Sequence, residues 1–340
     1  MRLVIVGGGP AALAAARGYR EAGGDGDVTM LTRELALPYM RPALSKEYLR
    51  GEVDEASLAL EPPQWYADHG IEVRLGATMS AVNDAVELID GTAIPFDVCI
   101  LATGARPRRL FDGPSTLRSL ADARELAKRQ GAATVIGSGF IGCEAAASLA
   151  MKGLDVTLVT DEDIPHQARL GEAAGRRIAG WLLALGVTLR TGTKATDGTL
   201  MAVGIESERI PVDAGMRTSR DGVYAAGDLV SAHNAAAGRR LDVEHWGEAL
   251  NMGEIAGRNA AGDDRVWDVA PGFWSTIGSH VLKYAAWGDG FDEARMVDHA
   301  RGAFTVWYGR EGTTVGVLTH DRDEDYERGK SLVETGAPLP

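Results

Sequence analysis

Short runs of apolar, often β-branched residues recur along the chain, and most of them are followed by segments whose apolar positions repeat with a helical period. Residues 3–6, 28–31, 98–101 and 156–159 form such runs. Nearly continuous apolar runs of this length are typical of buried strands in parallel sheets. Because strands that alternate with helical segments build βαβ units, the pattern predicts an α/β fold.

A glycine-rich turn follows the first apolar run, and a second copy occurs later in the chain. The small residues follow the spacing G-x-G-x-x-A or G-x-G-x-x-G and are Gly7, Gly9 and Ala12, then Gly137, Gly139 and Gly142. Such a turn lets backbone N–H groups approach a pyrophosphate, and the following helix N-terminus adds positive potential. One copy alone is a weak signal because similar turns also occur for steric reasons, whereas two copies predict two dinucleotide-binding units.

The remaining pattern predicts further helices and strands, and the composition changes near the C-terminus. Helices are expected over residues 11–19, 47–50, 119–130, 168–185 and 241–259. Further strands are expected over residues 71–75, 86–89, 134–136, 187–189, 200–205 and 223–226. From about residue 266 aromatic and β-type residues dominate, and expected strands at 303–308 and 314–319 indicate a small α+β domain.

The charge balance and the length of the apolar runs narrow the function classes. The net charge of −13 argues against general nucleic-acid binding and against an anionic membrane surface. No apolar run approaches the roughly 18 residues that a membrane-spanning helix requires. We therefore expect a cytoplasmic protein with no nucleic-acid or membrane partner.

Cysteine and histidine usage indicates neither a disulfide framework nor a metal site. Cys99 and Cys143 lie far apart and form no C-x-x-C pair, so both are interpreted as small buried hydrophobic residues. The histidines show no metal-ligand spacing. The acidic segment 321–325 lacks the glycine and the final glutamate of a calcium loop, and it is interpreted as a solvated turn.

Acidic residues that follow predicted strands are candidates for contacts to ribose or other sugar hydroxyls. Glu34 follows the second strand, and Asp228 follows Gly227 at the end of a late strand. Asp161 and Glu162 follow the strand of the second glycine-rich unit, and no pair of arginines is present there to receive a 2′-phosphate, so NADH is favoured over NADPH. Thr160, however, occupies the position where the acid is most expected. The segment 37–46 contains two prolines, Arg41 and Lys46, and it is either an ordinary loop or a contact for a polyphosphate or an anionic reduced ring. Composition alone favours the ordinary loop.

The order of these motifs resembles that of a known family of flavoproteins. The resemblance rests on residues 38–46 (PYMRPALSK), 102–108 (ATGARPR), 218–228, 243–246 (VEHW) and 273–275 (FWS), together with the two glycine-rich units. The chain is similar to the pyridine nucleotide–disulfide oxidoreductase superfamily, and within it to the ferredoxin and rubredoxin reductase branch that serves Rieske oxygenases and cytochromes P450. Compared with that branch, the stretch between Arg190 and Arg217 is short, and Met40 and Ala43 replace an acid and a proline.

The resemblance implies a domain organisation and a set of cofactor contacts. An FAD-binding domain is expected over residues 1–114 and 215–265, a shortened NAD(H)-binding domain over 115–214, and the α+β domain over 266–340. Contacts to FAD, by resemblance, come from Gly7, Gly9, Ala12, Glu34, Arg41, Lys46, Ala102, Thr103, Gly104, Arg108, Gly227, Asp228, His245, Trp246 and Trp274. Contacts to NADH come from Gly137, Gly139, Phe140, Ile141, Gly142, Glu144 and Gly204. Lys46 and Glu144 are expected to pair and to act in catalysis.

The resemblance also implies a reaction. A dithiol relay is not available from Cys99 and Cys143, and Ser45 stands where NADH oxidases and peroxidases of the superfamily have a cysteine. The chain is therefore expected to pass a hydride from NADH to FAD and single electrons to a ferredoxin or rubredoxin, as a monomer or dimer. The alternatives are an NADH oxidase or apoptosis-inducing-factor-like flavoprotein that uses oxygen or quinone, and a nucleotide-sensing flavoprotein with little turnover.

Overall fold

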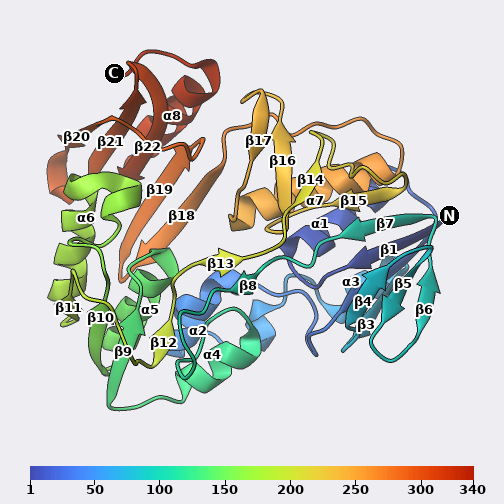
Figure 1. The fold of residues 1–340 in the computed structure, drawn as a ribbon, viewed down its shortest axis with the longest axis horizontal. Coiled ribbons are helices and arrows are strands. Elements are labelled where there is room, and N and C mark those ends of the chain that lie inside the picture. The colour runs from blue at the N-terminus through green and yellow to red at the C-terminus, as the bar shows by residue number, and fades with distance from the viewer. The chain divides into compact units, whose positions relative to one another are not determined.

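The computed structural model describes residues 1–340, and the chain forms two compact units (Figure 1). Unit 1 contains residues 1–40, 59–105 and 207–271, and unit 2 contains residues 41–58, 106–206 and 272–340. The mixed α/β architecture with parallel sheets confirms the expected fold class.

Unit 1 is built on a parallel sheet of five strands in the order β15-β7-β1-β2-β3. The strands are β1 (Arg2–Val6), β2 (Asp27–Thr32), β3 (Ile71–Leu75), β7 (Val98–Leu101) and β15 (Val223–Ala225). β1 pairs with β2 on one side, with Leu3 opposite Val28, and with β7 on the other, with Val4 opposite Cys99. Because all five strands run parallel, the turns that follow them lie along one edge of the sheet.

Two helices of unit 1 pack closely against one another through small residues. These are α1 (Pro10–Glu21) and α7 (Trp246–Ala260), which run side by side in Figure 1. A Cβ atom at Gly253 would lie 2.3 Å from the carbonyl oxygen of Ala11, and one at Gly257 would lie 2.0 Å from that of Ala15. The absence of side chains at these two positions is therefore what allows the two backbones to approach.

Smaller elements complete unit 1. An antiparallel sheet contains β4 (Met79–Val82), β5 (Ala85–Leu88) and β6 (Ala93–Pro95), and α3 (Pro63–Asp68) precedes β3. A second small sheet has the order β14-β16-β17, formed by β14 (Ile210–Val212), β16 (Val230–Asn234) and β17 (Arg239–Leu241). β16 follows directly after the turn that ends β15, and the N–H of Ile210 on β14 donates to the carbonyl oxygen of Leu229 in that turn at 2.9 Å.

Unit 2 contains a parallel sheet of four strands in the order β11-β10-β9-β12. The strands are β9 (Ala132–Ile136), β10 (Asp155–Val159), β11 (Thr188–Arg190) and β12 (Leu200–Met201), and the helices are α4 (Leu120–Ala127), α5 (Phe140–Met151) and α6 (Gln167–Ala184). Ser119 and Asp122 form a capping box at the start of α4. Residues 41–58 add η1 (Arg41–Ser45), α2 (Glu47–Arg50) and η2 (Ala56–Leu58), and β8 (Arg106–Pro107) pairs with β13 (Ile205–Glu206).

The C-terminal residues of unit 2 form an antiparallel sheet in the order β18-β19-β22-β21-β20. The strands are β18 (Gly272–Ile277), β19 (His280–Ala286), β20 (Glu293–Asp298), β21 (Phe304–Arg310) and β22 (Thr313–His320), with η3 (Ala300–Gly302) before β21 and α8 (Asp323–Thr335) after β22. Ala285, Trp307 and Val317 form a core against which Tyr326 packs. The expected strands at 303–308 and 314–319 are confirmed here.

Three sequence predictions were wrong in detail. The expected strand over 200–205 is interrupted at Gly204, whose φ of +99° separates β12 from β13. The expected helix over 241–259 begins only at Trp246, because Leu241 ends strand β17. The segment 321–325 is not simply a turn, since Asp323, Glu324 and Asp325 form the first turn of α8, where the helix dipole favours acidic side chains.

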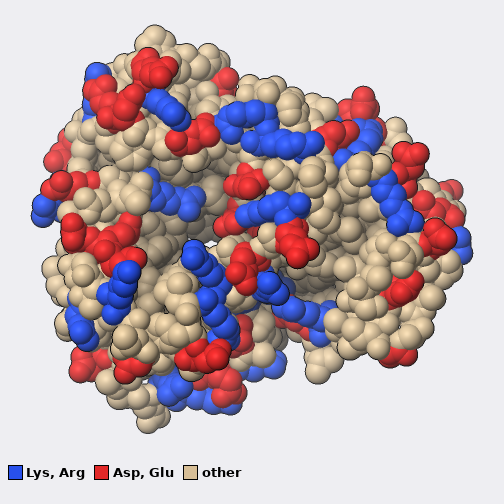
Figure 2. Space-filling view, viewed as in Figure 1, with Lys and Arg blue, Asp and Glu red and all other residues tan.

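The surface carries both signs of charge in small groups. On the face shown in Figure 2, acidic and basic side chains are interspersed. No helix is both long enough and apolar enough to cross a membrane.

Candidate cofactor-binding sites

The first glycine-rich turn has the geometry of a nucleotide cradle. Gly7 follows β1 with a φ of +148°, and a Cβ atom there would lie 2.1 Å from the carbonyl oxygen of Ala102. Gly9 is the N-cap of α1, which has no side-chain cap hydrogen bond and no acidic residue in its first turn. No side chain therefore caps the first N–H groups of α1, and these groups are suited to bind a pyrophosphate.

The other residues predicted to contact FAD in unit 1 gather around the same edge of the parallel sheet. Glu34 follows β2, residues 102–104 follow β7, and Gly227 and Asp228 follow β15. Gly227 has a φ of +84° and sits over α1, since a Cβ atom there would lie 3.2 Å from that of Ala11. The predicted contacts of unit 1 thus follow four strands of one parallel sheet, β1, β2, β7 and β15, at the same edge.

The structure also places Glu34 and the two residues at the start of α7 that are predicted to contact FAD. The hydroxyl of Tyr39 donates to the Glu34 carboxylate at 2.7 Å, which fixes this half-buried acid at the end of β2. His245 is the N-cap of α7 and Trp246 is its first residue, so both lie at the helix N-terminus, as the resemblance implies.

The second glycine-rich turn, in unit 2, repeats this geometry. Gly137 has a φ of +99°, and its Cβ would lie 2.4 Å from the carbonyl oxygen of Ala202; a Cβ on Gly142 would lie 2.0 Å from the carbonyl oxygen of Gly137. Gly139 is the N-cap of α5, which again lacks a side-chain cap and an early acidic residue. A Cβ at Gly139 would meet no other atom within 4 Å, so the turn leaves open space beside the helix N-terminus.

An acidic side chain stands beside this second turn. The Ser138 hydroxyl donates to the carboxylate of Glu162 at 3.0 Å, and the backbone N–H of Ala168 donates to the other carboxylate oxygen at 3.0 Å. The hydroxyl of Thr160 is engaged with that of Ser138 at 2.8 Å. Glu162, and not Thr160, therefore supplies the negative charge next to the turn after β10.

The pair expected between Lys46 and Glu144 forms within unit 2, and it is almost completely buried. The Lys46 Nζ lies 2.6 Å from the Glu144 Oε2, and the two side chains are 7% and 5% exposed. Removing two such charges from water costs several kcal/mol per ion and is offset only when the remaining polar atoms are also paired. Lys46 Nζ accordingly also donates to the carbonyl oxygen of Pro42 at 3.0 Å.

Two serines complete this network, and sequence analysis assigned neither of them a role in it. The hydroxyl of Ser45 donates to Glu144 Oε2 at 2.6 Å, and that of Ser275, on β18, donates to Oε1 at 2.6 Å. Ser275 is fully buried. Ser275 belongs to the FWS motif, but its partner Glu144 is 131 residues away in sequence, and no local pattern indicates that contact.

An aromatic cluster borders the start of α5. The ring of Phe140 packs 4.2 Å from that of His166 and 4.7 Å from that of Phe273, between centroids, and the Arg169 guanidinium lies over both phenylalanine rings. Burial, aided by the charge of Arg169, lowers the pKa of His166 to about 3. The Nε2 of His166 is buried with no hydrogen-bond partner.

The remaining predicted contacts lie in unit 2. Arg41 donates to the carbonyl oxygen of Arg118 at 2.9 Å, and the N–H of Arg108 donates to the carbonyl oxygen of Gly204 at 3.0 Å, which brings two predicted contacts together. Ile141 is 40% exposed and Trp274 is 45% exposed. These two large apolar side chains are therefore available to a ligand or partner, in contrast to the buried Glu144 and Ser275.

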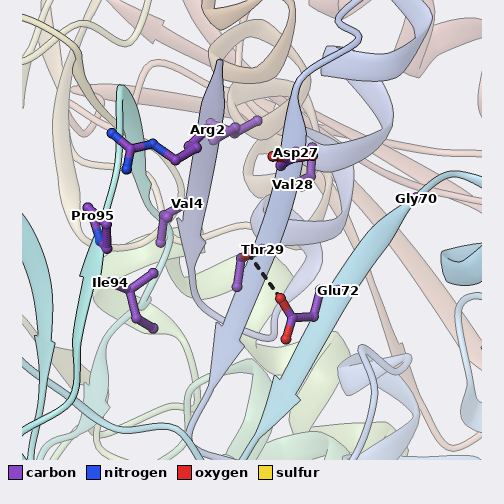
Figure 3. A pocket seen from close by; sticks show the side chains of 10 residues that line it. Arg2, Val4, Asp27, Val28, Thr29, Gly70, Glu72, Ile94 and Pro95 are labelled. Carbon is purple, nitrogen blue, oxygen red and sulfur yellow. Dashed lines mark hydrogen bonds between the residues drawn. The ribbon is translucent and has the colours of Figure 1, made fainter.

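A cavity of about 400 Å³ lies at the opposite end of the unit 1 sheet (Figure 3). It is lined at the amino ends of the strands by Arg2, Asp27 and Glu72, and on β6 by Ile94 and Pro95. None of the predicted cofactor contacts lines it, so it is separate from the glycine-rich edge.

Comparison with known proteins agrees with this geometry. A profile of the family described as pyridine nucleotide-disulphide oxidoreductase matches residues 1–202. The chain is 30% identical to the anthranilate 1,2-dioxygenase system ferredoxin–NAD(+) reductase component of Burkholderia cepacia, over 98% of this chain and 94% of that protein. It is 31% identical to rhodocoxin reductase of Rhodococcus erythropolis, over 100% of this chain and 91% of that protein.

A solved structure shares the whole architecture. The reductase in the covalent putidaredoxin reductase–putidaredoxin complex superposes with a TM-score of 0.90 at 26% identity, covering 99% of this chain and 94% of that chain. The alignment to the Burkholderia relative spans 383 positions, more than the 340 residues present here, so this chain lacks segments that the relative has. With two glycine-rich turns, a buried Lys46–Glu144 pair and these relatives, the chain belongs to the pyridine nucleotide-disulphide oxidoreductase family.

Proposed function

We propose that this protein is an FAD-dependent NADH:ferredoxin reductase that passes electrons singly to a ferredoxin or rubredoxin. The observation that carries the proposal is the presence of two glycine-rich turns, each at the carboxyl edge of its own parallel sheet and each followed by a helix without a side-chain cap. The names of the relatives support the choice of an iron–sulfur protein as the acceptor.

FAD is assigned to unit 1. The N–H groups at the start of α1 are proposed to bind its pyrophosphate, and the carboxylate of Glu34 is proposed to accept hydrogen bonds from the adenosine ribose. Asp228 is assigned to the ribityl hydroxyls, and the N-terminus of α7 to the edge of the ring where reduction builds negative charge. In the domain organisation that the resemblance implies, residues 1–114 and 215–265 bind FAD, 115–214 bind NAD(H), and 266–340 form the C-terminal domain. These bounds differ from those of the two compact units, in which residues 41–58 and 106–114 belong to unit 2 and residues 207–214 and 266–271 belong to unit 1.

NADH is assigned to the turn at Gly137–Gly142, and Glu162 supports NADH over NADPH. A carboxylate at this place accepts hydrogen bonds from ribose hydroxyls and repels a 2′-phosphate. The Glu162 carboxylate is held there by Ser138 and by the N–H of Ala168. Phe140, Ile141 and Gly204 are proposed to border the nicotinamide.

Bound FAD would supply the redox chemistry, as an acceptor for the hydride of NADH and a donor of single electrons. The chain's part is to orient groups and to place charge. Lys46 is proposed to supply a positive charge to the reduced ring, and Glu144 to hold the Lys46 ammonium in a single position. Because the pair is buried and hydrogen-bonded on both sides, it is preorganised and needs no rearrangement during the reaction.

The two cysteines do not support a sulfur relay. Cys99 belongs to unit 1 and Cys143 to unit 2, and both are buried free thiols. Burial raises the pKa of Cys99 to about 12 and raises that of Cys143 as well, so neither forms a reactive thiolate at neutral pH. Ser45, which donates to Glu144, fills the position of a catalytic cysteine in other branches.

Anaerobic titration of the purified protein tests this proposal. We expect a flavin absorbance spectrum that bleaches rapidly with NADH and slowly with NADPH, and electron transfer to an added [2Fe–2S] ferredoxin. A colourless preparation that takes up no FAD would contradict the proposal. Rapid peroxide formation without an acceptor protein would instead indicate an oxidase, and slow bleaching with a long-lived charge-transfer band would indicate a nucleotide sensor.

A cytoplasmic location and a monomeric or dimeric state remain predictions.

A further inference from the structure

One arginine ties together the two parts of unit 1 that are proposed to hold the flavin end of FAD. Arg209 lies in the short connection between β13 and β14. Its Nη1 donates to the backbone carbonyl oxygen of Asp228 at 2.6 Å, and its Nη2 forms an ion pair with the carboxylate of Glu244. One guanidinium thus reaches both the turn after β15 and the segment that leads into α7.

The two partners of Arg209 lie at the two places where the flavin end of FAD is proposed to bind. Asp228 follows Gly227 in the turn after β15, and Glu244 immediately precedes His245, the N-cap of α7. The Ser207 hydroxyl adds a second hydrogen bond to the Asp228 carbonyl oxygen at 3.2 Å. The connection 207–209 therefore closes over the turn through side chains from both of its ends.

The surroundings of Arg209 make the contact a strong one. Its side chain is only 22% exposed, and the carboxylate of Asp242 lies 3.9 Å from Nε on the same side as Glu244. Charge-assisted hydrogen bonds in a partly desolvated setting are stronger than those between neutral groups. Only a planar guanidinium can direct separate N–H groups to a carbonyl oxygen and a carboxylate in fixed directions, so lysine is not an equivalent residue.

We infer that Arg209 is a positioning residue for FAD: it holds the Asp228 turn and the N-terminus of α7 at a fixed spacing. The inference rests on the proposed function, in which Asp228 binds the ribityl chain and α7 faces the flavin ring. Arg209 is not itself assigned a contact to FAD, and it acts through the backbone carbonyl oxygen of Asp228 and the carboxylate of Glu244.

The chain offers a matched control in Arg240. Its Nη1 donates to the carbonyl oxygens of Val212 at 2.6 Å and Ser231 at 2.8 Å, so it too joins strands of the β14-β16-β17 sheet by carbonyl hydrogen bonds. These contacts do not involve the turn at 227–228. Substitution of Arg240 therefore removes the same charge and hydrogen bonds to carbonyl oxygens within this sheet, whereas Arg209 precedes its first strand, and it leaves the proposed FAD contacts untouched.

The test is FAD binding by apo-protein, measured by quenching of flavin fluorescence, for wild type, Arg209→Ala, Arg209→Lys and Arg240→Ala. We expect Arg209→Ala to weaken FAD binding by about tenfold or more, since a hydrogen bond to a charged group is worth roughly that factor. Arg209→Lys should recover only part of the loss, and Arg240→Ala should bind within about threefold of wild type. Thermal unfolding of each apo-protein measures any general loss of stability.

The outcomes separate this inference from the proposed function. Equal FAD affinity in Arg209→Ala and wild type, or an equal loss in Arg209→Ala and Arg240→Ala, overturns the role of Arg209. Failure of the wild type itself to bind FAD overturns the proposed function instead.

A double variant distinguishes positioning from a simple charge effect. If Arg209 positions the turn, the losses from Arg209→Ala and Glu244→Gln should be less than additive when combined, because each breaks the same connection. If Arg209→Ala/Glu244→Gln returns to wild-type affinity, the loss came only from the uncompensated charge of Glu244, and the positioning role is overturned.

Discussion

At the scale of single residues, the chemistry of this protein depends on buried polar groups that are satisfied from several elements. Glu144 receives hydrogen bonds from Lys46, Ser45 and Ser275, which belong to residues 41–58 and to β18. His166 represents the opposite case, since its Nε2 is buried without a partner. The first arrangement fixes one carboxylate in place, whereas the second makes stability depend on pH.

The first prediction concerns the carboxylate of Glu144 and the Ser275 hydroxyl that donates to it. Glu144→Gln should slow reduction of the flavin by NADH about tenfold or more while FAD stays bound, because the Lys46 ammonium loses its charged partner. Ser275→Ala should produce a smaller slowing in the same direction, and it should have little further effect in the Glu144→Gln background. Stopped-flow reduction measures both.

Thr319→Val is the matched control for Ser275→Ala. Thr319 lies in the same antiparallel sheet, and its hydroxyl is buried without a partner. Its replacement should leave the reduction rate unchanged. Wild-type reduction rates in Glu144→Gln, or equal slowing by Ser275→Ala and Thr319→Val, would count against the proposed network.

The second prediction concerns His166 and pH. The folded protein holds the pKa of His166 at about 3, whereas an unfolded histidine titrates near 6.5. Between these values the unfolded state binds more protons, so this group lowers the free energy of unfolding as pH falls below 6.5, by up to about 1.4 kcal/mol per pH unit. His280, whose pKa burial also lowers, contributes in the same direction.

His166→Asn should make the pH dependence less steep. Asparagine tolerates the left-handed conformation at this position, where φ is +61°, and does not protonate. Urea unfolding at pH 7.0, 6.0 and 5.0 measures the slope. Parallel curves for the two proteins would show that His166 is not the group responsible.

At the scale of elements, the two glycine-rich units are alike because the same local sequence demands the same local structure. In each, a strand is followed by a glycine with positive φ and by a helix with a glycine N-cap. Errors occurred where a partner far away in sequence decided the element. Leu241 became part of a strand because it pairs with Ala232 of β16, and periodicity within residues 241–259 carries no information on that pairing.

The third prediction tests the packing of α1 on α7. Gly257→Ala would place a Cβ 2.0 Å from the carbonyl oxygen of Ala15, where only backbone atoms are available to move. Overpacking of this kind should destabilise the protein by about 1–3 kcal/mol or more. Denaturant unfolding of the apo-protein measures the change.

Gly180→Ala in α6 is the control for this prediction. No atom lies within 4 Å of a Cβ at that position, so the substitution should stabilise the helix by up to about 1 kcal/mol. A Gly257→Ala variant as stable as the wild type would mean that α1 and α7 move apart without cost.

At the scale of the whole molecule, each unit has its own parallel sheet, its own glycine-rich turn and one free cysteine. The acidic balance of the chain is spread in small groups over the face in Figure 2. The family includes enzymes named for disulfide chemistry, yet this chain has no pair of cysteines within one unit. Its reaction is therefore expected to be independent of thiols.

The fourth prediction follows from that expectation. A variant with Cys99→Ala and Cys143→Ala should transfer electrons from NADH to ferredoxin at the wild-type rate. Its stability should fall by about 1 kcal/mol per site, since each replacement leaves a small cavity in the core. A large loss of turnover in a variant that remains folded and retains FAD would show that a thiol takes part.

The amino-acid sequence by itself determined the α/β class, the two glycine-rich turns and the positions of Glu34 and Asp228 after strands. These features depend on local periodicity and on backbone conformations that few residues adopt. Only the tertiary structure decided that Ser45 and Ser275 satisfy Glu144, that Glu162 stands beside Ser138, and that Arg209 joins Asp228 to Glu244. Such contacts join residues far apart in the chain. Their geometry depends on how sheets and helices pack, which no local pattern specifies.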